Sequence, residues 1–499
     1  MEIAFYPLSL LILSFLIWIK SKSRGGFLNL SYITIFIFSL WLTLVYIFIN
    51  SLTGRGIDEA AIFHVGVIFD AKVWLQFWEI SLLVIILAII SFIFFYKFSK
   101  KRRSRGEVRM IWLAHTSLFL GLLFHPAISD IHRIVKDIYT NHGPDILGIE
   151  LERQTDSVQA INPRSFVYLY LESLDQVFLD EKKFPGLMPE LSKIIKKSGQ
   201  INGLHQAPMT GWTMAGLVST QCGLPLARAA TSALNVTRNS IPICVGDILK
   251  EHDYYLSFMG GADLTFAGKG LFYKLHGFKD VFGASDLEEL AGKRLERSQW
   301  GVFDDDILDL AWQRVEQLSS KPERFGLVLL TVDTHPPHGH KTPSCKGIKY
   351  GSGESGVLNS VHCTDYLVSK FIKKFLSSEK TNDVALIISS DHLMMANDAN
   401  IEINEEKRNN TFVFFNASQE NEVLITRQAS MLDIAPTLLH LIGFDVETLG
   451  FGRNLYKGNP TLSEKYGKKE FYRLIHVWGN VLQSKLSRDT KENKKEKDL

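Results

Sequence analysis

The chain has 499 residues, 46% of them hydrophobic and 22% charged, with a formal net charge of +2 at pH 7. This balance lacks the basic excess of nucleic-acid-binding proteins, so we expect no nucleic-acid partner. The average hides an uneven distribution, because long apolar runs crowd the N-terminal third of the chain.

Four long apolar runs predict membrane-spanning helices. Each approaches the ~20 residues that an α-helix needs to cross a bilayer. One such run is also compatible with a buried core helix, but four in succession, separated by charged or turn-rich loops, favour a membrane domain. The first run lacks the basic start and the cleavage pattern of a signal peptide, so we expect it to remain as a span. The runs are Ile3 to Ile19, Tyr32 to Ile49, Phe77 to Tyr96 and Met110 to about Ile128.

The charges of the loops predict the orientation of these spans. Basic residues near helix ends stay on the cytoplasmic side. Loops 20–26 and 97–109 are strongly basic, whereas loop 51–75 carries both signs. The cluster KKRRSR could also bind nucleic acid, but its position between two spans favours a topology signal in contact with anionic lipids. An even number of spans then places both termini, and everything after residue 130, outside the cytoplasm.

The chain changes character at about residue 162. Short apolar strands alternating with amphipathic stretches predict an α/β domain with a mainly parallel central sheet. We expect spans at 1–129, a juxtamembrane connector at 130–160, an extracytoplasmic α/β domain at 161–470, and a C-terminal segment at 471–499 with a disordered charged tail. Residues 471–483 are expected to pack on the domain. The expected strands cover 165–171, 254–259, 326–332, 384–390 and 411–415, and a helix is expected at 189–199.

Polar residues follow three of the expected strands. Glu172 ends the first of them, Asp333-Thr334-His335 the third and Asp391-His392 the fourth. In open α/β sheets, ligands bind beyond the carboxyl ends of the strands. Carboxylates with one imidazole suit a divalent cation, although any single Asp or Glu at a strand end can equally be a cap or a solvated turn. Together these residues predict a metal site.

The stretch MTGWTMAGLVSTQCGLPL, from Met209 to Leu226, supplies a hydroxyl. Thr213 is the preferred nucleophile over Thr210, Ser219 and Thr220, because TMAGLVSTQ is typical of a helix that begins near Thr213. A helix N-terminus offers free amide hydrogens to an anion. The alternative is that Thr213 only caps the helix. The metal would favour the alkoxide and neutralise charge on a transferring phosphoryl or sulfuryl group.

The motifs resemble the alkaline phosphatase and sulfatase superfamily, and within it the membrane-bound phosphoglycerol transferases related to lipoteichoic acid synthases. The matching residues occur in the family's order and extend over roughly 160–456. They include Glu172-Ser-Leu, Thr213, Thr334-His335, Ser390-Asp391-His392 and the late segments SMLDIAPTLL and GRNL. The segments GWTMAGLVSTQCGLPL, GGADLTFAGKGLFYKLHGF, SCKGIKYGSG and TGRGIDEAAIFHVG are similar to the phosphoglycerol transferase I group.

The resemblance implies roles for individual residues. Glu172, Thr213, Asp391 and His392 would bind one divalent metal, with Mn²⁺ or Mg²⁺ favoured and Zn²⁺ possible. Thr213 would also be the nucleophile, and His335 would contact the phosphoglycerol or protonate the leaving alcohol.

The chain departs from the lipoteichoic acid synthases after the strand at 254–259. Those enzymes use a Trp and an Arg there, whereas the nearest residues in this chain are Asp263 and Lys269. Both are carried forward as substrate-binding candidates, and Lys269 would offer a phosphate a point charge. Trp300, at the start of WGVFDDDILD, is either a substrate residue or part of the core.

All four cysteines follow the last expected span, as in domains that fold in an oxidising compartment. Three pairings are possible, and we favour Cys222 with Cys244 and Cys345 with Cys363. Sulfatases need a modified Cys or Ser in a C-x-P-x-R frame, which Cys222 followed by Pro225 and Arg228 does not provide.

The resemblance implies a multi-pass protein of the bacterial inner membrane with its catalytic domain in the periplasm. Phosphoglycerol would move from phosphatidylglycerol to a periplasmic glucan hydroxyl through a phospho-threonine intermediate, with release of diacylglycerol. Membrane lipids would surround the spans. Two alternatives stay open: a phosphoethanolamine transferase with the same core, and a non-catalytic membrane-tethered protein that binds glycan or lipid.

Overall fold

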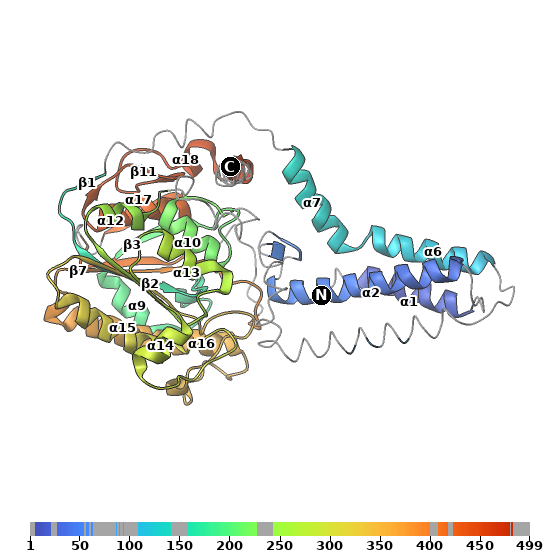
Figure 1. Ribbon diagram of the computed structural model, residues 1–499, viewed down its shortest axis with the longest axis horizontal. Coiled ribbons are helices and arrows are strands. Elements are labelled where there is room, and N and C mark those ends of the chain that lie inside the picture. The colour runs from blue at the N-terminus through green and yellow to red at the C-terminus, as the bar shows by residue number, and fades with distance from the viewer. Residues whose placement is uncertain are drawn as a thin grey trace, which may run out of the picture. The chain divides into compact units, whose positions relative to one another are not determined.

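The chain forms two compact units, Met1–Asn141 and His142–Leu499. The computed structural model describes residues 5–20, 27–53, 56–58, 61–62, 86, 89, 93, 108–140, 158–226, 243–399, 408–417, 423–479 and 481–482. Figure 1 shows helices in the first unit, and helices around a central sheet in the second.

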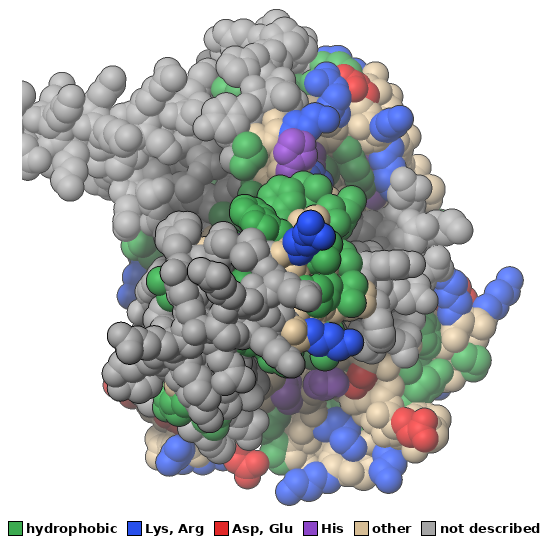
Figure 2. All heavy atoms as spheres, turned by 90° about the vertical axis from the view of Figure 1, so that its right-hand side faces the viewer, with side chains coloured by type: hydrophobic (Ala, Val, Ile, Leu, Met, Phe, Trp, Pro, Cys, Tyr) green, Lys and Arg blue, Asp and Glu red, His purple; other side chains and the backbone are tan. Residues whose placement is uncertain are grey.

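The first unit buries several polar side chains within its apolar core and exposes many large apolar ones. Its helices are α1 (Phe5–Lys20), α2 (Phe27–Thr53), α6 (Val108–Leu123) and α7 (Pro126–Thr140). Between α1, α2 and α6, the buried Ser14 hydroxyl lies 2.8 Å from the Tyr32 hydroxyl and donates to the backbone oxygen of Ala114. The outward side chains include Leu16, Phe38 and Phe119. Figure 2, which turns the right-hand side of Figure 1 toward the viewer, shows hydrophobic side chains gathered over these helices. Large apolar side chains gathered on the outside in this way are unusual for a water-soluble bundle.

Within the described part of the chain, one helix is long and apolar enough to span a membrane, at Leu30–Ile47. The first expected span forms α1, which at 16 residues is shorter than a membrane-spanning helix needs to be. The third expected span, Phe77 to Tyr96, lies almost wholly outside the described residues. The fourth was expected to run to about Ile128, but the helix ends at Leu123 and Pro126 begins α7 at 49° to it. If α6 and α7 together count as one bent span, the described residues contain two candidate membrane spans. A multi-span domain is therefore a proposal.

An eight-stranded sheet organises the second unit. The strand order is β5-β4-β6-β2-β7-β8-β3-β9, and β8 alone pairs in antiparallel fashion, with β7 and β3. The expected mainly parallel sheet is confirmed. The strands are β2 (Ser165–Leu171), β3 (Gly199–His205), β4 (Tyr255–Gly260), β5 (Asp280–Phe282), β6 (Phe325–Leu330), β7 (Val384–Ser390), β8 (Phe412–Phe415) and β9 (Leu424–Ser430). Two small pairs lie outside the sheet, β1 (Gln159–Ala160) with β10 (Phe444–Asp445), and β11 (Thr448–Leu449) with β12 (Gly452–Arg453).

Helices cover both faces of the sheet (Figure 1). Val167, Leu169 and Leu171 of β2 pack into a core with one group of helices, while Tyr168 and Tyr170 point to the opposite face, where Tyr170 contacts Thr220. This alternation follows from the two-residue period of a strand. The first group contains α9 (Pro189–Ile194), α14 (Ala284–Ala291), α15 (Asp304–Ser319) and α16 (Gly356–Ser377). The second contains α10 (Thr213–Cys222), α12 (Val245–Glu251), α13 (Lys269–Leu275) and α17 (Ile434–Leu441), and Tyr273 of α13 stacks on Phe258 of β4. The short helix α18 (Leu462–Tyr466) contacts the edge strand β9.

Short 3₁₀ turns complete the unit. They are η3 (Gln176–Leu179), η4 (Ile195–Lys197), η5 (Phe266–Gly268), η6 (Pro343–Cys345), η7 (Glu379–Thr381) and η9 (Met431–Asp433). The helix expected at 189–199 is thus split between α9 and η4, and β3 begins at Gly199.

The C-terminal segment packs on the second unit, as expected. Residues 471–479 are helical, and Phe471, Ile475 and Trp478 are buried. The Trp478 ring stacks on Phe451 at a centroid distance of 4.9 Å. Residues 483–499, which include the expected charged tail, lie outside the described residues.

Two disulfides join Cys222 to Cys244 and Cys345 to Cys363. This confirms the favoured sequential pairing. The first bond ties the end of α10 to the start of α12, and the second ties η6 to α16. Both bonds therefore hold connections on which the carboxyl edge of the sheet depends.

Replacing Gly216 by alanine is expected to push α10 away from the loop after β7. The added Cβ would overlap the backbone oxygen of Asp391, and such overpacking costs about 1–3 kcal/mol. Thermal unfolding should therefore give a lower Tm for Gly216→Ala than for wild type. The control is Gly347→Ala, because no heavy atom lies within 4 Å of a Cβ added there. Equal Tm values for both variants would contradict the close approach of α10 to this loop.

Candidate active site

The register of the parallel strands brings Glu172 and Asp391 together. Leu171 at the end of β2 pairs with Ser390 at the end of β7, so the next residue of each strand is one of these two acids. β6 flanks β2 on its other side and leads into Asp333, Thr334 and His335. The polar strand ends identified in the sequence therefore share one edge of the sheet, where open α/β sheets bind ligands.

Thr213 faces this edge from α10. It is the first residue of the helix, and the N-cap is Trp212, which makes no side-chain capping bond. The Thr213 hydroxyl instead donates to Oε2 of Glu172 at 3.3 Å. Thr213 is therefore not the residue that caps the helix, so the capping alternative is wrong. The hydroxyls of Thr210, Ser219 and Thr220 bond to backbone oxygens, whereas that of Thr213 bonds to Glu172.

Glu172, Asp391 and His392 form a buried cluster of metal-ligand type. One ligand atom from each lies within 4.8 Å of the others. Nε2 of His392 is 3.3 Å from Oε1 of Glu172 and 3.4 Å from Oδ2 of Asp391. Nδ1 of His392 bonds to the backbone oxygen of Leu393, which directs Nε2 toward the carboxylates. Neither this Nε2 nor Oδ2 of Asp391 has a hydrogen-bond partner among the described residues. Two buried ligand atoms without partners fit a bound cation.

The electrostatics of the cluster also fit a cation. Burial opposes ionisation of Glu172, but the imidazole of His392, 3.3 Å away, holds the pKa of Glu172 at about 2. Burial, followed by the charge of Glu172, raises the pKa of Asp391 to about 7. Burial disfavours the charged imidazole, yet Asp391 and Glu172 raise the pKa of His392 to about 9. The two carboxylates thus compete for the one positive charge in the cluster, and a divalent cation would satisfy both.

Ser173 holds both carboxylates in place. Its hydroxyl donates to Oε1 of Glu172 at 2.8 Å, and its backbone N–H donates to Oδ1 of Asp391 at 2.9 Å. Its φ of 54° lies in the left-handed region, which a residue other than glycine rarely adopts. Thr334 adds a hydroxyl bond to the backbone oxygen of Glu172. These contacts orient the proposed ligands before any cation binds.

Gln206 supports the cluster from β3. Its Oε1 accepts the backbone N–H of Leu393 at 2.7 Å and so holds the loop that carries His392. Sequence reasoning missed Gln206 because the strand before it was not predicted. It also missed Ser173, although the position of that residue between a strand end and the cluster was a usable signal.

His335 lies against Trp300. The two rings stack at a centroid distance of 3.7 Å. Nδ1 of His335 bonds to the backbone oxygen of Pro336, which leaves Nε2 as the atom able to exchange a proton with a substrate. Burial lowers the pKa of His335, against the opposing effect of Glu172. Trp300 precedes α15, which begins at Asp304 within the segment WGVFDDDILD.

The structure separates the environments of Lys269 and Asp263. Lys269, the first residue of α13, is only 5% exposed, and its ammonium lies over the Phe266 ring. Burial lowers its pKa, whereas the charges of Glu172, Asp391 and Asp263 raise it. Asp263 is exposed and accepts the N–H and hydroxyl of Thr265. Lys269 is therefore a buried cation near the carboxylates, and Asp263 is an exposed turn residue.

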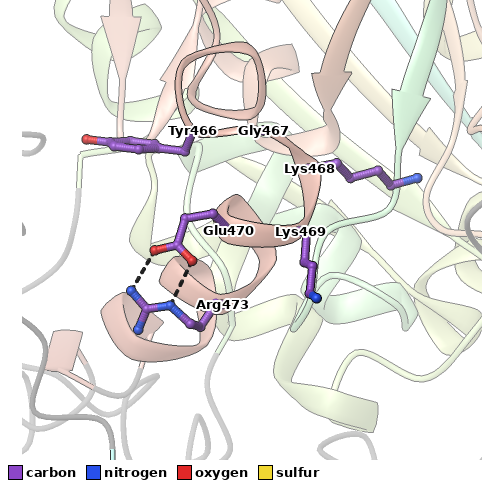
Figure 3. Close-up of a pocket in the computed structure, with 6 residues that line it drawn as sticks. All are labelled: Tyr466, Gly467, Lys468, Lys469, Glu470 and Arg473. Atoms are coloured by element: carbon purple, nitrogen blue, oxygen red, sulfur yellow. Dashed lines mark hydrogen bonds and ion pairs between the residues drawn. The ribbon is translucent and has the colours of Figure 1, made fainter.

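Two other features do not form part of this site. Cys222, Cys244 and His276 also lie close enough to hold a metal, but the two sulfurs are joined in a disulfide. A surface hollow lies near the C-terminal segment (Figure 3), and in it Arg473 forms two bonds with Glu470. The hollow is lined by Tyr466, Gly467, Lys468, Lys469, Glu470 and Arg473, none of which belongs to the carboxylate cluster.

Comparison with known proteins shows the family. A sequence model of the sulfatases matches residues 164–444. The chain belongs to the sulfatase family. A second model, described as the N-terminal domain of phosphoglycerol transferase I, matches residues 3–141. Within the family, the disulfide of Cys222 leaves that residue unavailable as a modified nucleophile, whereas Thr213 faces the cluster.

The similar curated proteins include phosphoglycerol transferases I. One from Xanthomonas euvesicatoria pv. vesicatoria is 32% identical over 451 residues, covering 88% of this chain and 63% of the relative. One from Salmonella choleraesuis is 31% identical over 437 residues, covering 85% of this chain and 53% of the relative. The chain thus spans little more than half the length of the curated relatives it matches.

Two solved structures show the same fold. An alkaline phosphatase superfamily protein from Vibrio parahaemolyticus has a TM-score of 0.55 and 21% identity, covering 66% of this chain and 82% of its own. The lipoteichoic acid synthase LtaP from Listeria monocytogenes has a TM-score of 0.54 and 16% identity, covering 69% of this chain and 97% of its own.

Removing the charge of Glu172 is expected to weaken cation binding. Glu172→Gln should lower the affinity for Mn²⁺ and Zn²⁺, measured by titration calorimetry, by more than the roughly 10- to 100-fold cost of losing an outer-shell partner. Ser173→Ala should lower the affinity for the same cations by roughly 10- to 100-fold. The control is Asp263→Asn, which removes an exposed carboxylate outside the cluster and should bind as wild type does. Unchanged affinity for Glu172→Gln would show that the cation binds elsewhere.

Proposed function

We propose that this protein transfers phosphoglycerol from phosphatidylglycerol to a glucan hydroxyl. The observation that carries the proposal is the Thr213 hydroxyl, which donates to Glu172 at the start of α10 beside three buried ligand groups. The similarity to phosphoglycerol transferases I, over most of this chain, supports phosphoglycerol as the transferred group. The glucan acceptor is the acceptor implied by the resemblance of the sequence motifs.

Glu172, Thr213, Asp391 and His392 would hold one divalent cation. When bound, a cation such as Mn²⁺, Mg²⁺ or Zn²⁺ would favour the deprotonated hydroxyl and neutralise charge on the phosphoryl group. Ser173 and Gln206 would keep the ligands oriented. Lys269 is proposed to bind a phosphate oxygen, and Trp300 to hold His335 in position by stacking. Asp263 is proposed to contact the glycerol headgroup through the outer side of its turn.

The reaction would proceed in two steps. In the first, the bond from Thr213 Oγ1 to phosphorus forms and the bond from phosphorus to the diacylglycerol oxygen breaks. The proton lost by Thr213 is balanced by the proton that the leaving oxygen gains. In the second step, an acceptor oxygen bonds to phosphorus, the bond to Thr213 breaks and Thr213 regains a proton. Nε2 of His335 accepts the proton of the acceptor hydroxyl, and the release of that proton balances the proton that Thr213 regains, so His335 ends the step neutral.

The N-terminal unit is proposed to hold the enzyme in the bacterial inner membrane by four spans. The apolar outer surfaces of α1, α2 and α6, and the basic loops 20–26 and 97–109, support this placement. The same charge pattern supports a periplasmic location for the α/β domain. Anchoring would keep the site near its lipid donor and raise the effective concentration of that donor.

Thr213→Ala is expected to abolish transfer. The full-length protein would be reconstituted with phosphatidylglycerol labelled in its headgroup glycerol, and label on protein and on glucan would be measured. Wild type and Thr213→Ser should transfer label, because both retain a hydroxyl. Thr213→Ala should form neither labelled protein nor labelled glucan. Ser219→Ala, which removes a hydroxyl on the same helix bonded to Gly216, should remain active.

A parallel reaction with labelled phosphatidylethanolamine separates the headgroups. Transfer from phosphatidylethanolamine alone would replace the phosphoglycerol proposal with a phosphoethanolamine transferase. Full activity of Thr213→Ala would exclude the threonine as nucleophile.

The acceptor half-reaction is expected to weaken at low pH. Burial lowers the pKa of His335 below its usual 6.5, so the neutral base predominates at pH 7 and is lost as the pH falls through that lowered pKa. The kcat/KM for the acceptor should therefore show an acid limb with its midpoint below 6.5. His335→Gln should remove the limb and lower the plateau by about 10²- to 10⁴-fold. An unchanged limb in that variant would exclude His335 as the base.

A further inference from the structure

Helix α7, from Pro126 to Thr140, has three distinct sides. It follows α6 after a break at Phe124 and His125. Proline begins the helix because its missing N–H is not needed in the first turn. Nδ1 of His125 accepts the N–H of Ala127, which stabilises the new start. The two segments meet at 49°, and Figure 1 shows α7 turned out of the line of α6.

One side of α7 packs within the N-terminal unit. Ala127 and Ile134 are buried, and α7 contacts α2. Oδ2 of Asp130 accepts the backbone N–H of Ile57, which ties the helix to the loop after α2. These contacts set the rotation of α7 about its own axis.

A second side is apolar and exposed. Phe124, Ile128, Ile131 and Val135 are 67%, 39%, 43% and 42% exposed. Their spacing follows the helical repeat, so they form one stripe. The third side is polar and exposed, and carries Ser129, His132, Arg133 and Lys136. A helix with one apolar and one basic exposed face is typical of helices that lie in the boundary between lipid and water.

We propose that α7 lies in the lipid–water boundary at the end of α6, with the stripe of Phe124, Ile128, Ile131 and Val135 against the lipid. The partner is the bilayer surface itself. The inference rests on the proposed membrane placement of the N-terminal unit, and it goes beyond the transfer reaction.

The dimensions of the helix agree with this position. Fifteen residues at 1.5 Å each give a helix about 22 Å long, and a 49° bend reduces its advance along the axis of α6 to about 15 Å. The boundary layer on each side of a bilayer is about 5–8 Å thick. Each residue advances about 1 Å along that axis, so Ile128 and Ile131 lie about 2 Å and 5 Å beyond Pro126, within the layer, and Val135, at about 9 Å, lies just beyond it. Arg133 and Lys136 have stems long enough to place their charges among the headgroups.

Site-directed spin labelling tests the position of α7. No described cysteine is free, since Cys222, Cys244, Cys345 and Cys363 are all in disulfides, so a nitroxide would attach to a single introduced cysteine. The full-length protein would be labelled at positions 128, 129, 131, 132, 135 and 136 in turn. In vesicles of phosphatidylethanolamine and phosphatidylglycerol, collisions with oxygen and with a water-soluble nickel complex would then be compared.

The ratio of oxygen to nickel collisions should be higher at 128 and 131 than at 129, 132 and 136. Along the stripe it should fall from 128 to 131 to 135. A label at Phe38 of α2, which is 59% exposed, is the matched control for membrane insertion. A water-exposed label at Phe38 would contradict the membrane placement itself, whereas the transfer assay tests the reaction separately.

Three outcomes would overturn the proposal while the Phe38 label remains in lipid. Equal access of nickel to all six positions would place α7 in water. High oxygen collision at position 136 as well as at 128 would make α7 part of a span. Low collision rates with both reagents along the stripe would show that protein covers it. Dipolar broadening of the nitroxide spectrum would identify that protein as a second copy of the chain.

Discussion

Two buried carboxylates held side by side are the constraint on which this structure depends. Glu172 and Asp391 follow the paired residues Leu171 and Ser390 of β2 and β7. The parallel register therefore places the two acids side by side, and the conformation of the loops is not needed for this. One imidazole, that of His392, is the nearest compensating charge. Like charges in a buried site are unfavourable unless a proton or a cation neutralises them. The two buried carboxylates thus repel each other, and a bound divalent cation would neutralise them.

The surrounding polar contacts hold the two carboxylates and His392 in place despite this repulsion. Ser173 bonds to both carboxylates, Thr334 bonds to the backbone of Glu172, and Gln206 holds the loop of His392. Each contact removes freedom from a ligand before binding, which lowers the entropy cost of assembling the site. Thr213 enters the same network through Glu172, and Gly216 allows its helix to lie against Asp391. The proposed nucleophile and the proposed ligands are therefore positioned by one set of contacts.

The sequence predicted those parts that have a strong local signal. The apolar runs that became β2, β6 and β7 were visible, and so were the acids that end them. β3 and β9 were missed because GQINGLH and LITRQAS alternate weakly and depend on pairing with distant strands. Gln206 was missed for the same reason. The break at Pro126 was missed because the apolar run continues through it, and hydrophobicity alone does not show where a helix bends.

The register of β2 against β7 has a consequence for how such enzymes diversify. A single insertion in either strand would rotate every later side chain to the opposite face and separate the two acids. The strands consequently tolerate substitution but not changes of length. The connections that leave the same edge, such as 261–268 and 336–355, are not paired in this register, so a change of length there leaves Glu172 and Asp391 side by side. What the edge of the sheet binds is therefore easier to alter, by evolution or by design, through those connections than through the strands.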